Sequence, residues 1–316
     1  MKKHALSLIA ALMALMLILT ACASHNDDND ERTVYAAGID EYARPAIWKN
    51  GLSFLTLDSV GFFNSVYVSG GILYAAGQAD GRPFYWRSDD PNRYNYLGNG
   101  DGWAASVHVS GGYTYVAGWD SYGGKIWRSA APGSAAAVLY DFGADAWPYS
   151  ICVYGSSVYA GGFDAYGSCV WENNQIIAGI DDDSAYIYSI DVSNGVVYAA
   201  GEVDERPVWF KTTGSDYSYY LGGDYGLATS VRVSGNYMYI AEYGDAAGRV
   251  WRGAASSNIT SIRYSLGSQA APESVFVSGN DVYTGGWDAG GGRIWRNGSP
   301  LYSLGYDTDV FSIFIN

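Results

Sequence analysis

The sequence predicts an all-β protein, a seven-bladed β-propeller with four antiparallel strands in each blade. Three observations predict this fold. A unit of about 41 residues recurs seven times, each unit divides into four strand-like pieces, and the two ends of the array are complementary fragments of one unit. The composition of the 316 residues agrees, because 16% aromatic residues and 41 Gly are typical of strands joined by tight turns.

The repeat is anchored by a Tyr that small residues follow, as in Val34-Tyr35-Ala36-Ala37-Gly38. Its spacings are 39, 41, 44, 39, 41 and 44, which indicates that a block of three units was duplicated and then extended by one. The Tyr series is Tyr35, Tyr74, Tyr115, Tyr159, Tyr198, Tyr239 and Tyr283, and the Trp series in step with it is Trp48, Trp86, Trp127, Trp171, Trp209, Trp251 and Trp295. The period matches a propeller blade and is too long for a leucine-rich repeat.

The four strands of a unit, which we call A to D, follow from local patterns. Strand A is a short alternating run that begins with Ser, strand B carries the Tyr, strand C the Trp, and strand D is a piece such as 94–97. Turns of the Ser-Gly type join A to B. The seven A runs are 65–68, 106–109, 150–153, 189–192, 230–233, 274–277 and 312–315.

The ends of the array predict how the ring closes. The first unit starts directly at strand B, over 33–38, and the last A strand, 312–315, has no unit after it. Pairing the two would complete blade 1 from both ends and remove an open sheet edge. A linear array would leave both fragments unpaired.

The N-terminus predicts export and lipid anchoring. Lys2 and Lys3 precede an apolar run over 5–19, the layout of a signal peptide. The following Leu19-Thr20-Ala21-Cys22 resembles the bacterial lipobox, which implies cleavage before Cys22 and lipidation of its thiol. We therefore expect a signal peptide over 1–21, an acidic tether over 22–32 and the propeller over 33–316. The alternative is an ordinary signal peptide or uncleaved anchor with a chance Cys.

The repeats also resemble a group of bacterial lipoproteins with V-Y-x-A-G and W-x-N-G units, the second motif being intact at Trp48-Lys49-Asn50-Gly51 and Trp295-Arg296-Asn297-Gly298. The resemblance implies a seven-bladed propeller and no established activity. Ala23, and not Asp, follows Cys22. By resemblance to enterobacterial sorting, this implies the outer membrane or cell surface rather than the inner membrane.

Charge and motifs exclude several classes of function. The net charge of −14 argues against nucleic acid and against an anionic lipid surface, so membrane contact is expected through the N-terminal lipid only. The sequence has three His and no G-x-S-x-G, H-E-x-x-H, C-x-x-C or calcium-loop motif. We expect a monomer with no cofactor and no metal.

An Asp follows strand B in every unit, and a basic residue follows it in six. The Asp residues are Asp40, Asp80, Asp120, Asp164, Asp204, Asp245 and Asp288, and the basic residues are Arg44, Arg82, Lys125, Arg206, Arg249 and Arg293. The sequence favours ion pairs that close each hairpin over a ring of catalytic carboxylates.

Deviations from the repeat suggest a binding site on one face. Alternating strands place the B–C turns and D–A loops on the same face, which we call the top. Four consecutive blades have an aromatic residue three positions before the strand A Ser, and two more aromatics precede the turn Asp. These candidate ligand-binding residues are Phe62, Trp103, Trp119, Trp147, Phe163 and Tyr186. Aromatic rings beside carboxylates suit a glycan or a peptide. The alternative is that they only fill gaps between loops.

A second, weaker candidate site lies on the channel side of strand A, two residues after the Ser. Four consecutive blades have a polar residue there: His108, Cys152, Asp191 and Arg232. Such an arc could hold a small anion or zwitterion, or Asp191 and Arg232 could simply pair. Cys152 and Cys169 are expected as free thiols, because strand B separates their strands by more than a disulfide spans.

The sequence thus favours a membrane-anchored, non-enzymatic protein that binds an extracytoplasmic glycan or protein. The alternatives are an envelope assembly scaffold that docks a membrane partner and, less favoured, a propeller glycosidase or lyase.

Overall fold

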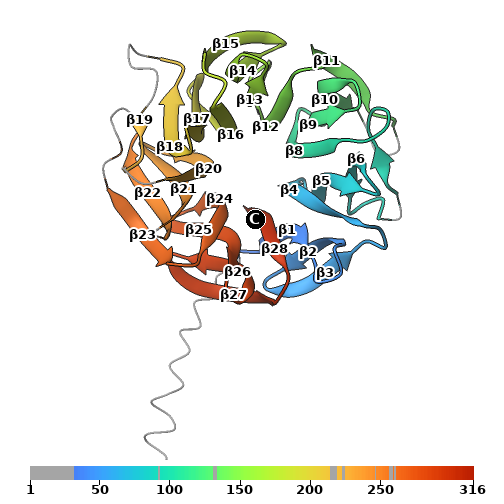
Figure 1. The fold of residues 1–316 in the computed structure, drawn as a ribbon. Helices are drawn as coiled ribbons and strands as arrows, with labels where there is room; N and C mark the ends of the chain where they lie inside the picture. The colour runs from blue at the N-terminus through green and yellow to red at the C-terminus, as the bar shows by residue number, and fades with distance from the viewer. Residues whose placement is uncertain are drawn as a thin grey trace, which may run out of the picture. The chain divides into compact units, whose positions relative to one another are not determined.

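A computed structural model describes residues 32–91, 93–130, 134–213, 219–222, 225–245, 247–255, 259 and 261–316. These residues form 28 strands in seven four-stranded antiparallel sheets, arranged as blades around a ring (Figure 1). The seven-bladed β-propeller predicted from the sequence is therefore confirmed. The predicted signal peptide, Cys22 and the tether up to residue 31 lie outside the described residues.

The strands follow the predicted order, from the inner strand A to the outer strand D. Blade 1 contains β28 (Asp309–Ile315), β1 (Val34–Ile39), β2 (Pro45–Lys49) and β3 (Leu52–Thr56). Blade 2 contains β4 (Gly61–Ser69), β5 (Ile72–Ala79), β6 (Arg82–Arg87) and β7 (Asn95–Tyr96), and blade 3 β8 (Trp103–Ser110), β9 (Tyr113–Asp120), β10 (Gly123–Ser129) and β11 (Ala137–Gly143). Blade 4 contains β12 (Trp147–Tyr154), β13 (Ser157–Asp164), β14 (Gly167–Glu172) and β15 (Gln175–Ile180), and blade 5 β16 (Ala185–Ser193), β17 (Val196–Val203), β18 (Arg206–Lys211) and β19 (Tyr219–Tyr220). Blade 6 contains β20 (Gly226–Ser234), β21 (Tyr237–Gly244), β22 (Gly248–Ala254) and β23 (Ile262–Gly267), and blade 7 β24 (Ala271–Ser278), β25 (Asp281–Asp288), β26 (Gly291–Arg296) and β27 (Ser299–Gly305).

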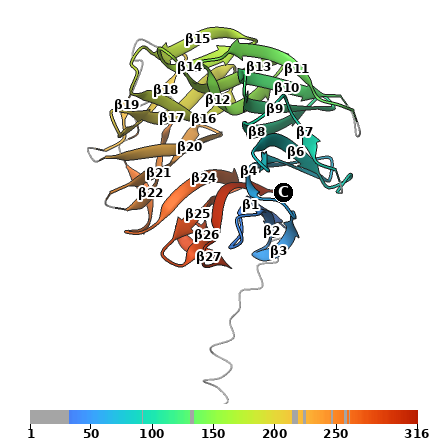
Figure 2. The ribbon, with the colours of Figure 1, turned by 45° about the vertical axis from the view of Figure 1, so that its right-hand side comes forward.

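Blade 1 is completed by both ends of the array, as the sequence predicts. β28 pairs antiparallel with β1, with Val34 opposite Ile315 and Ala37 opposite Ser312. The backbones of Thr33 and Asn316 extend this pairing by two hydrogen bonds of 2.8 and 2.9 Å. Figures 1 and 2 both show the last strand beside the first.

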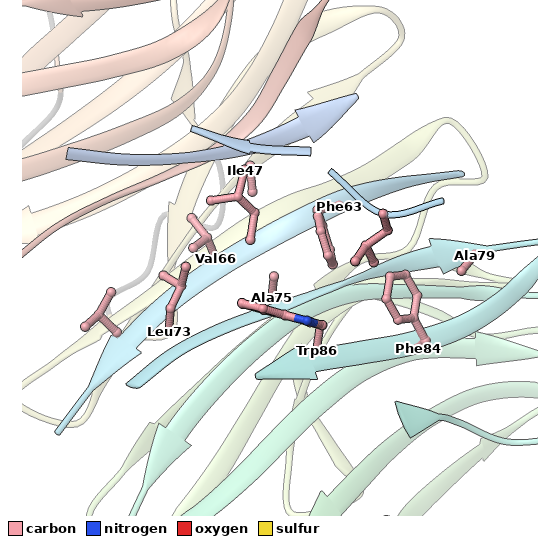
Figure 3. Packing of buried hydrophobic residues seen from close by; sticks show 11 residues of the cluster. Ile47, Phe63, Val66, Leu73, Ala75, Ala79, Phe84 and Trp86 are labelled. Carbon is pink, nitrogen blue, oxygen red and sulfur yellow. The ribbon is translucent and has the colours of Figure 1, made fainter. Parts of the chain in front are cut away.

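The repeated Trp residues pack between neighbouring blades. Trp86 of β6 is 2% exposed and lies in a cluster with Ile47 of blade 1 and with Phe63 and Phe84 of blade 2 (Figure 3). All seven Trp side chains are buried. The prediction that these rings are structural wedges rather than ligand contacts agrees with this packing.

One blade departs from the repeat in its core. Where the other blades have Gly at the fourth position of the Tyr motif, blade 6 has Glu242, which is fully buried. Its carboxylate accepts hydrogen bonds from the Arg249 guanidinium at 3.3 Å and from Trp251 Nε1. Both partners lie in the same blade, so this buried charge is compensated locally.

Candidate functional site

Each inner strand contains a β-bulge immediately before the repeated Ser. In β4, for example, Phe63 pairs with Gly77 and Ser65 with Ala76, which leaves Asn64 as the extra residue. A bulge re-aims side chains, so that the extra residue and the Ser both face the channel. The seven extra residues, which we call the bulge ring, are Phe311, Asn64, Ala105, Tyr149, Tyr188, Thr229 and Glu273.

The bulge ring and the repeated Ser residues line a cavity of about 380 Å³. Trp103 and Leu227 complete the lining. Since all seven inner strands contribute, the cavity lies on the propeller axis, and its volume is in the range of small-ligand sites. The inner strands start on the top face, so the lining runs from Trp103 near the top down to the Ser residues.

The Ser residues form a closed ring of hydrogen bonds, which we call the serine ring. Each Ser Oγ accepts the backbone N–H of the residue that follows the Ser of the next blade, over 3.1 to 3.3 Å. The donors, in blade order from 2 to 7 and then 1, are Val66, Val107, Ile151, Ile190, Val231, Val275 and Ile313. The serine ring thus joins every blade to its neighbour at the floor of the cavity.

Below the serine ring, the side chains two residues after each Ser form a third layer, which we call the plug ring. Its members are Tyr67, His108, Cys152, Asp191, Arg232, Phe276 and Phe314. Tyr67 packs on His108 and on Phe314 with ring centroids 4.8 and 5.0 Å apart. Phe276 packs on Phe314 at 5.0 Å and lies under the Arg232 guanidinium at 4.6 Å. None of these residues lines the cavity, whose lining ends at the serine ring.

The four polar residues proposed as a channel site belong to the plug ring, where they interact with neighbouring residues of the protein. Asp191 pairs with Arg232 at 3.8 Å, which is the alternative that the sequence analysis left open. Asp191 also accepts the Val233 N–H at 2.7 Å. Burial, together with the charge of Arg232, lowers the pKa of His108 to about 4. Burial, with the nearby Asp191, raises the pKa of Cys152 to about 12. Both groups are therefore neutral near pH 7, which argues against an anion site.

The six aromatic candidates do lie together, in two clusters. Phe62 contacts Trp103, and Trp103 contacts Trp119, with ring centroids 5.1 and 5.2 Å apart. On the next two blades, Phe163 contacts Trp147 at 5.0 Å and Tyr186 at 4.8 Å. The predicted grouping on one half of the top face is thus present.

Three further aromatic residues, which the sequence analysis did not predict, join and extend these clusters. Tyr149 bridges them, with centroid distances of 5.3 Å to Trp119 and 5.8 Å to Phe163. Tyr188 contacts Tyr149 at 5.9 Å, and Phe311 contacts Phe62 at 6.0 Å. We call these nine residues the aromatic array. The three additions are bulge-ring residues that line the cavity, whereas among the six predicted residues only Trp103 does so.

The rest of the bulge ring gives the cavity a polar side. Thr229 donates to the Pro272 carbonyl at 2.7 Å, and Asn64 donates to the Ala104 carbonyl at 3.3 Å. Glu273 has no hydrogen-bond partner among the described residues, and it is the only carboxylate that lines the cavity. Burial, aided by the negative charge of Asp309, raises the pKa of Glu273 to about 7.

The turn Asp residues only partly match the prediction of one ion pair per hairpin. Asp40, Asp120 and Asp288 pair with Arg44, Lys125 and Arg293, at 2.7, 3.0 and 2.8 Å. In three other blades the pairing prediction is wrong. Arg82 and Arg206 lie over the rings of Tyr96 and Tyr220, at 4.2 and 4.1 Å, and Arg249 pairs with Glu242.

The reason lies in the position of the Asp relative to the turn. In blades 2 and 5 the Asp is itself the first residue of a two-residue turn, with Ala79 opposite Arg82 and Val203 opposite Arg206. In blades 3 and 7 the Asp is the last residue of strand B, and the basic residue lies two positions into strand C. The turn residues Asp80 and Asp204 have positive φ, as tight hairpin turns require. The Arg that pairs at the strand end then extends over the neighbouring strand D, and not back to the turn.

Cys152 lies on β12 and Cys169 on β14, with β13 between them, and both thiols are free. Over the described part of the chain, the structure has no group of three His, Cys, Asp or Glu residues placed to hold a metal ion. Within the same residues, it has no helix of the length and apolar character needed to cross a membrane.

The blades, their closure and the axial cavity define the chain as a seven-bladed β-propeller. Among solved structures it is similar to the computationally designed Ika8 protein, at 16% identity and a TM-score of 0.56, over 88% of this chain and 86% of that one. It is also similar to the WD40 β-propeller domain of Doa1, at 15% identity and a TM-score of 0.54, over 78% of this chain and 84% of that domain. No family model matches the sequence, and no curated protein matches it. At these identities, the similarity supports the fold alone.

Proposed function

We propose that this protein is a lipid-anchored binding protein of the bacterial cell envelope, which holds an extracytoplasmic glycan or peptide in the axial cavity. The observation that carries the proposal is the aromatic array, which covers one half of the cavity rim and reaches into the cavity through Tyr149, Tyr188 and Phe311. Flat rings opposite a few polar groups supply apolar contact area at small entropic cost, while the polar groups orient the ligand.

Binding is favoured over catalysis by the content of the cavity. Glycoside hydrolysis generally uses two carboxyl groups that flank the scissile bond. Glu273 is the single carboxylate in the cavity lining, and the described lining has no His, Lys, Arg or Cys. The proposal is therefore a non-enzymatic binding module, with an assembly scaffold as the alternative.

The anchoring part of the proposal rests on the sequence at Cys22. It predicts that the full-length chain takes up labelled fatty acid and sediments with the envelope. The Cys22→Ala variant should lose both properties and keep the fold. Labelling that persists in this variant would contradict lipidation at Cys22.

The binding part is tested with the full-length chain in detergent against glycan and peptide panels. Trp103→Ala and Tyr149→Ala should each weaken binding roughly tenfold, as expected when a ligand loses one aromatic contact. Trp287→Ala is the control, because Trp287 lies at the top of blade 7, where it contacts Tyr243 at 6.1 Å outside the aromatic array.

Four results would contradict the proposal. Equal losses in all three variants would place the site elsewhere. Binding that none of them affects would make the aromatic array structural. Cleavage of a glycan in the panel would replace binding with catalysis, and capture of a membrane partner by crosslinking, with no small ligand, would favour the scaffold.

A further inference from the structure

The ionisable groups of the cavity are unbalanced. Among the described residues, its lining contains one carboxylate, Glu273, and no basic side chain. The two Tyr hydroxyls in the lining are neutral near pH 7, as phenols ordinarily are, and burial raises the pKa of both Tyr149 and Tyr188 further. An anionic ligand would meet no positive charge in the cavity, whereas a cationic group would meet a carboxylate that lacks a hydrogen-bond partner among the described residues.

The aromatic side of the cavity also suits a cation. Phe311, on the blade next to Glu273, and Trp103, Tyr149 and Tyr188, on blades 3 to 5, all contribute to its lining. Ring faces attract ammonium groups, and several rings that line one cavity together with a carboxylate resemble the cages that hold organic cations. The hydroxyl of Tyr188 donates to Glu202 outside the cavity, which fixes this ring in place.

The depth of the cavity limits which part of a ligand can enter. The cavity lining ends at the serine ring, and the plug ring, whose neighbouring side chains contact one another, lies below it. A ligand that enters from the top therefore meets Glu273 with a terminal group or a side chain.

We propose that the cavity recognises a terminal ammonium group of its ligand, with Glu273 as the counter-ion and the lining aromatics as the cage. This inference rests on the proposed function, since it names the ligand chemistry of the same site. It selects cationic ligands over neutral and anionic ones of the same shape.

The surroundings of Glu273 predict how binding depends on pH. Asp309 on β28 disfavours the charged carboxylate, and no cation offsets it within the cavity. The other charged groups on neighbouring elements are paired: Arg232 of β20 with Asp191, Glu242 of β21 with Arg249, and Asp281 and Asp288 of β25 with Arg296 and Arg293. The carboxyl therefore ionises near pH 7, and affinity for a cation should rise as the pH rises through that value.

The test compares small probes that differ only in charge, with the full-length chain in detergent. Phenethylamine, phenethyl alcohol and phenylacetate form one series, and the pairs glucosamine with glucose and phenylalanine amide with its N-acetyl derivative distinguish a sugar from a peptide source. Calorimetry should give at least tenfold tighter binding of phenethylamine than of phenethyl alcohol at pH 8. The sugar and peptide amines should show a preference of the same sign at pH 7, because α-amino groups with pKa values of about 7.7 to 8.0 are partly neutral at pH 8. The affinity of phenethylamine should fall several-fold at pH 6, where this amine stays charged.

Two variants isolate the carboxylate. Glu273→Gln keeps the size of the side chain and should abolish both the amine preference and the pH dependence. Asp309→Asn removes the repelling charge, so it should keep the preference and move the midpoint of the pH dependence to lower pH.

Neutral probes that bind as tightly as amines would overturn the inference, and so would amine binding that Glu273→Gln leaves unchanged. The absence of binding by every probe at millimolar concentration would also reject it. Neutral glycans that bind in a Trp103-dependent manner would leave the proposed function intact while the ammonium site fails.

Discussion

Breaking the ion pair of Asp120 and Lys125 from one side should cost far more unfolding free energy than breaking its equivalent in blade 7. Both side chains are buried, Asp120 at 1% and Lys125 at 7% exposure, with 3.0 Å between Oδ1 and Nζ. Asp120 also accepts the backbone N–H groups of Tyr122 at 2.9 Å and Asn99 at 3.0 Å. Burial alone would raise the pKa of Asp120, but these two hydrogen bonds and Lys125 together lower it.

The Asp120→Asn variant leaves the Lys125 ammonium buried without its main counter-charge. Breaking a buried pair from one side costs about 3 to 5 kcal/mol of unfolding free energy. Asp141 lies 3.7 Å from the same ammonium and is 58% exposed, so it compensates only in part. We therefore expect a loss near the lower limit, about 3 kcal/mol.

The control is Asp288→Asn at the same position of the repeat. Asp288 accepts the N–H of Gly290 at 2.8 Å in the same type of turn, but its pair with Arg293 is more exposed, at 24% and 21%. Losing such a pair costs about 1 kcal/mol or less. Urea unfolding followed by Trp fluorescence measures both variants, and equal losses of stability would refute the claim that burial determines the value of these pairs.

Three further predictions use the serine ring, the plug ring and the thiols. Ser312→Ala removes the acceptor of the Val66 N–H, so it should cost about 1 kcal/mol, and an unchanged urea midpoint would contradict a stabilising role for the serine ring. His108 is held neutral by burial and by Arg232, which lower its pKa from 6.5 to about 4. Its contribution to stability is therefore complete above pH 6.5 and declines as the pH falls to 4, because only the unfolded state takes up the proton. Relative to His108→Phe, the wild type should lose about 3 kcal/mol over this range, and a constant difference in urea unfolding would contradict this. Burial raises the pKa of Cys152 and of Cys169, so in mass spectrometry neither thiol should react with an alkylating reagent at pH 8 until the protein unfolds, and rapid labelling of the folded protein would contradict the burial.

The fold could be predicted because its determinants recur with the blades. One Tyr, one Trp and one Ser per unit reveal the length of the repeat. The incomplete units at the two ends of the array predict that the ring closes in blade 1. The site was harder to predict, because a β-bulge that occurs in every blade adds one residue to each inner strand without changing the spacing pattern of the repeat. Strict alternation buries the residue before each Ser, whereas the bulge turns Tyr149, Tyr188 and Glu273 into the cavity.

The aromatic positions at the rim could be predicted, because they precede the bulge and the bulge does not alter their place in the repeat. Phe62, Trp103 and Tyr186 lie before the bulge, at the start of the inner strand, where a search for departures from symmetry finds them directly. Their function is not determined by that search. The pairing of turn residues was mispredicted where the Asp lies within the turn itself, as Asp80 does, and the Arg directly follows that turn.

The sharing of blade 1 between β28 and β1 also determines the order in which the fold can be completed. Strands β1 to β3 lack their inner neighbour until Asp309–Ile315 becomes available, although they precede all other strands in the chain. Joining segments roughly 270 residues apart costs about 5 kcal/mol of chain entropy in a flexible chain, and less once six blades are stacked between them. Ring closure is therefore expected as a late, cooperative step, and a chain arrested before β28 should expose the edge of β1 to proteases and to other chains.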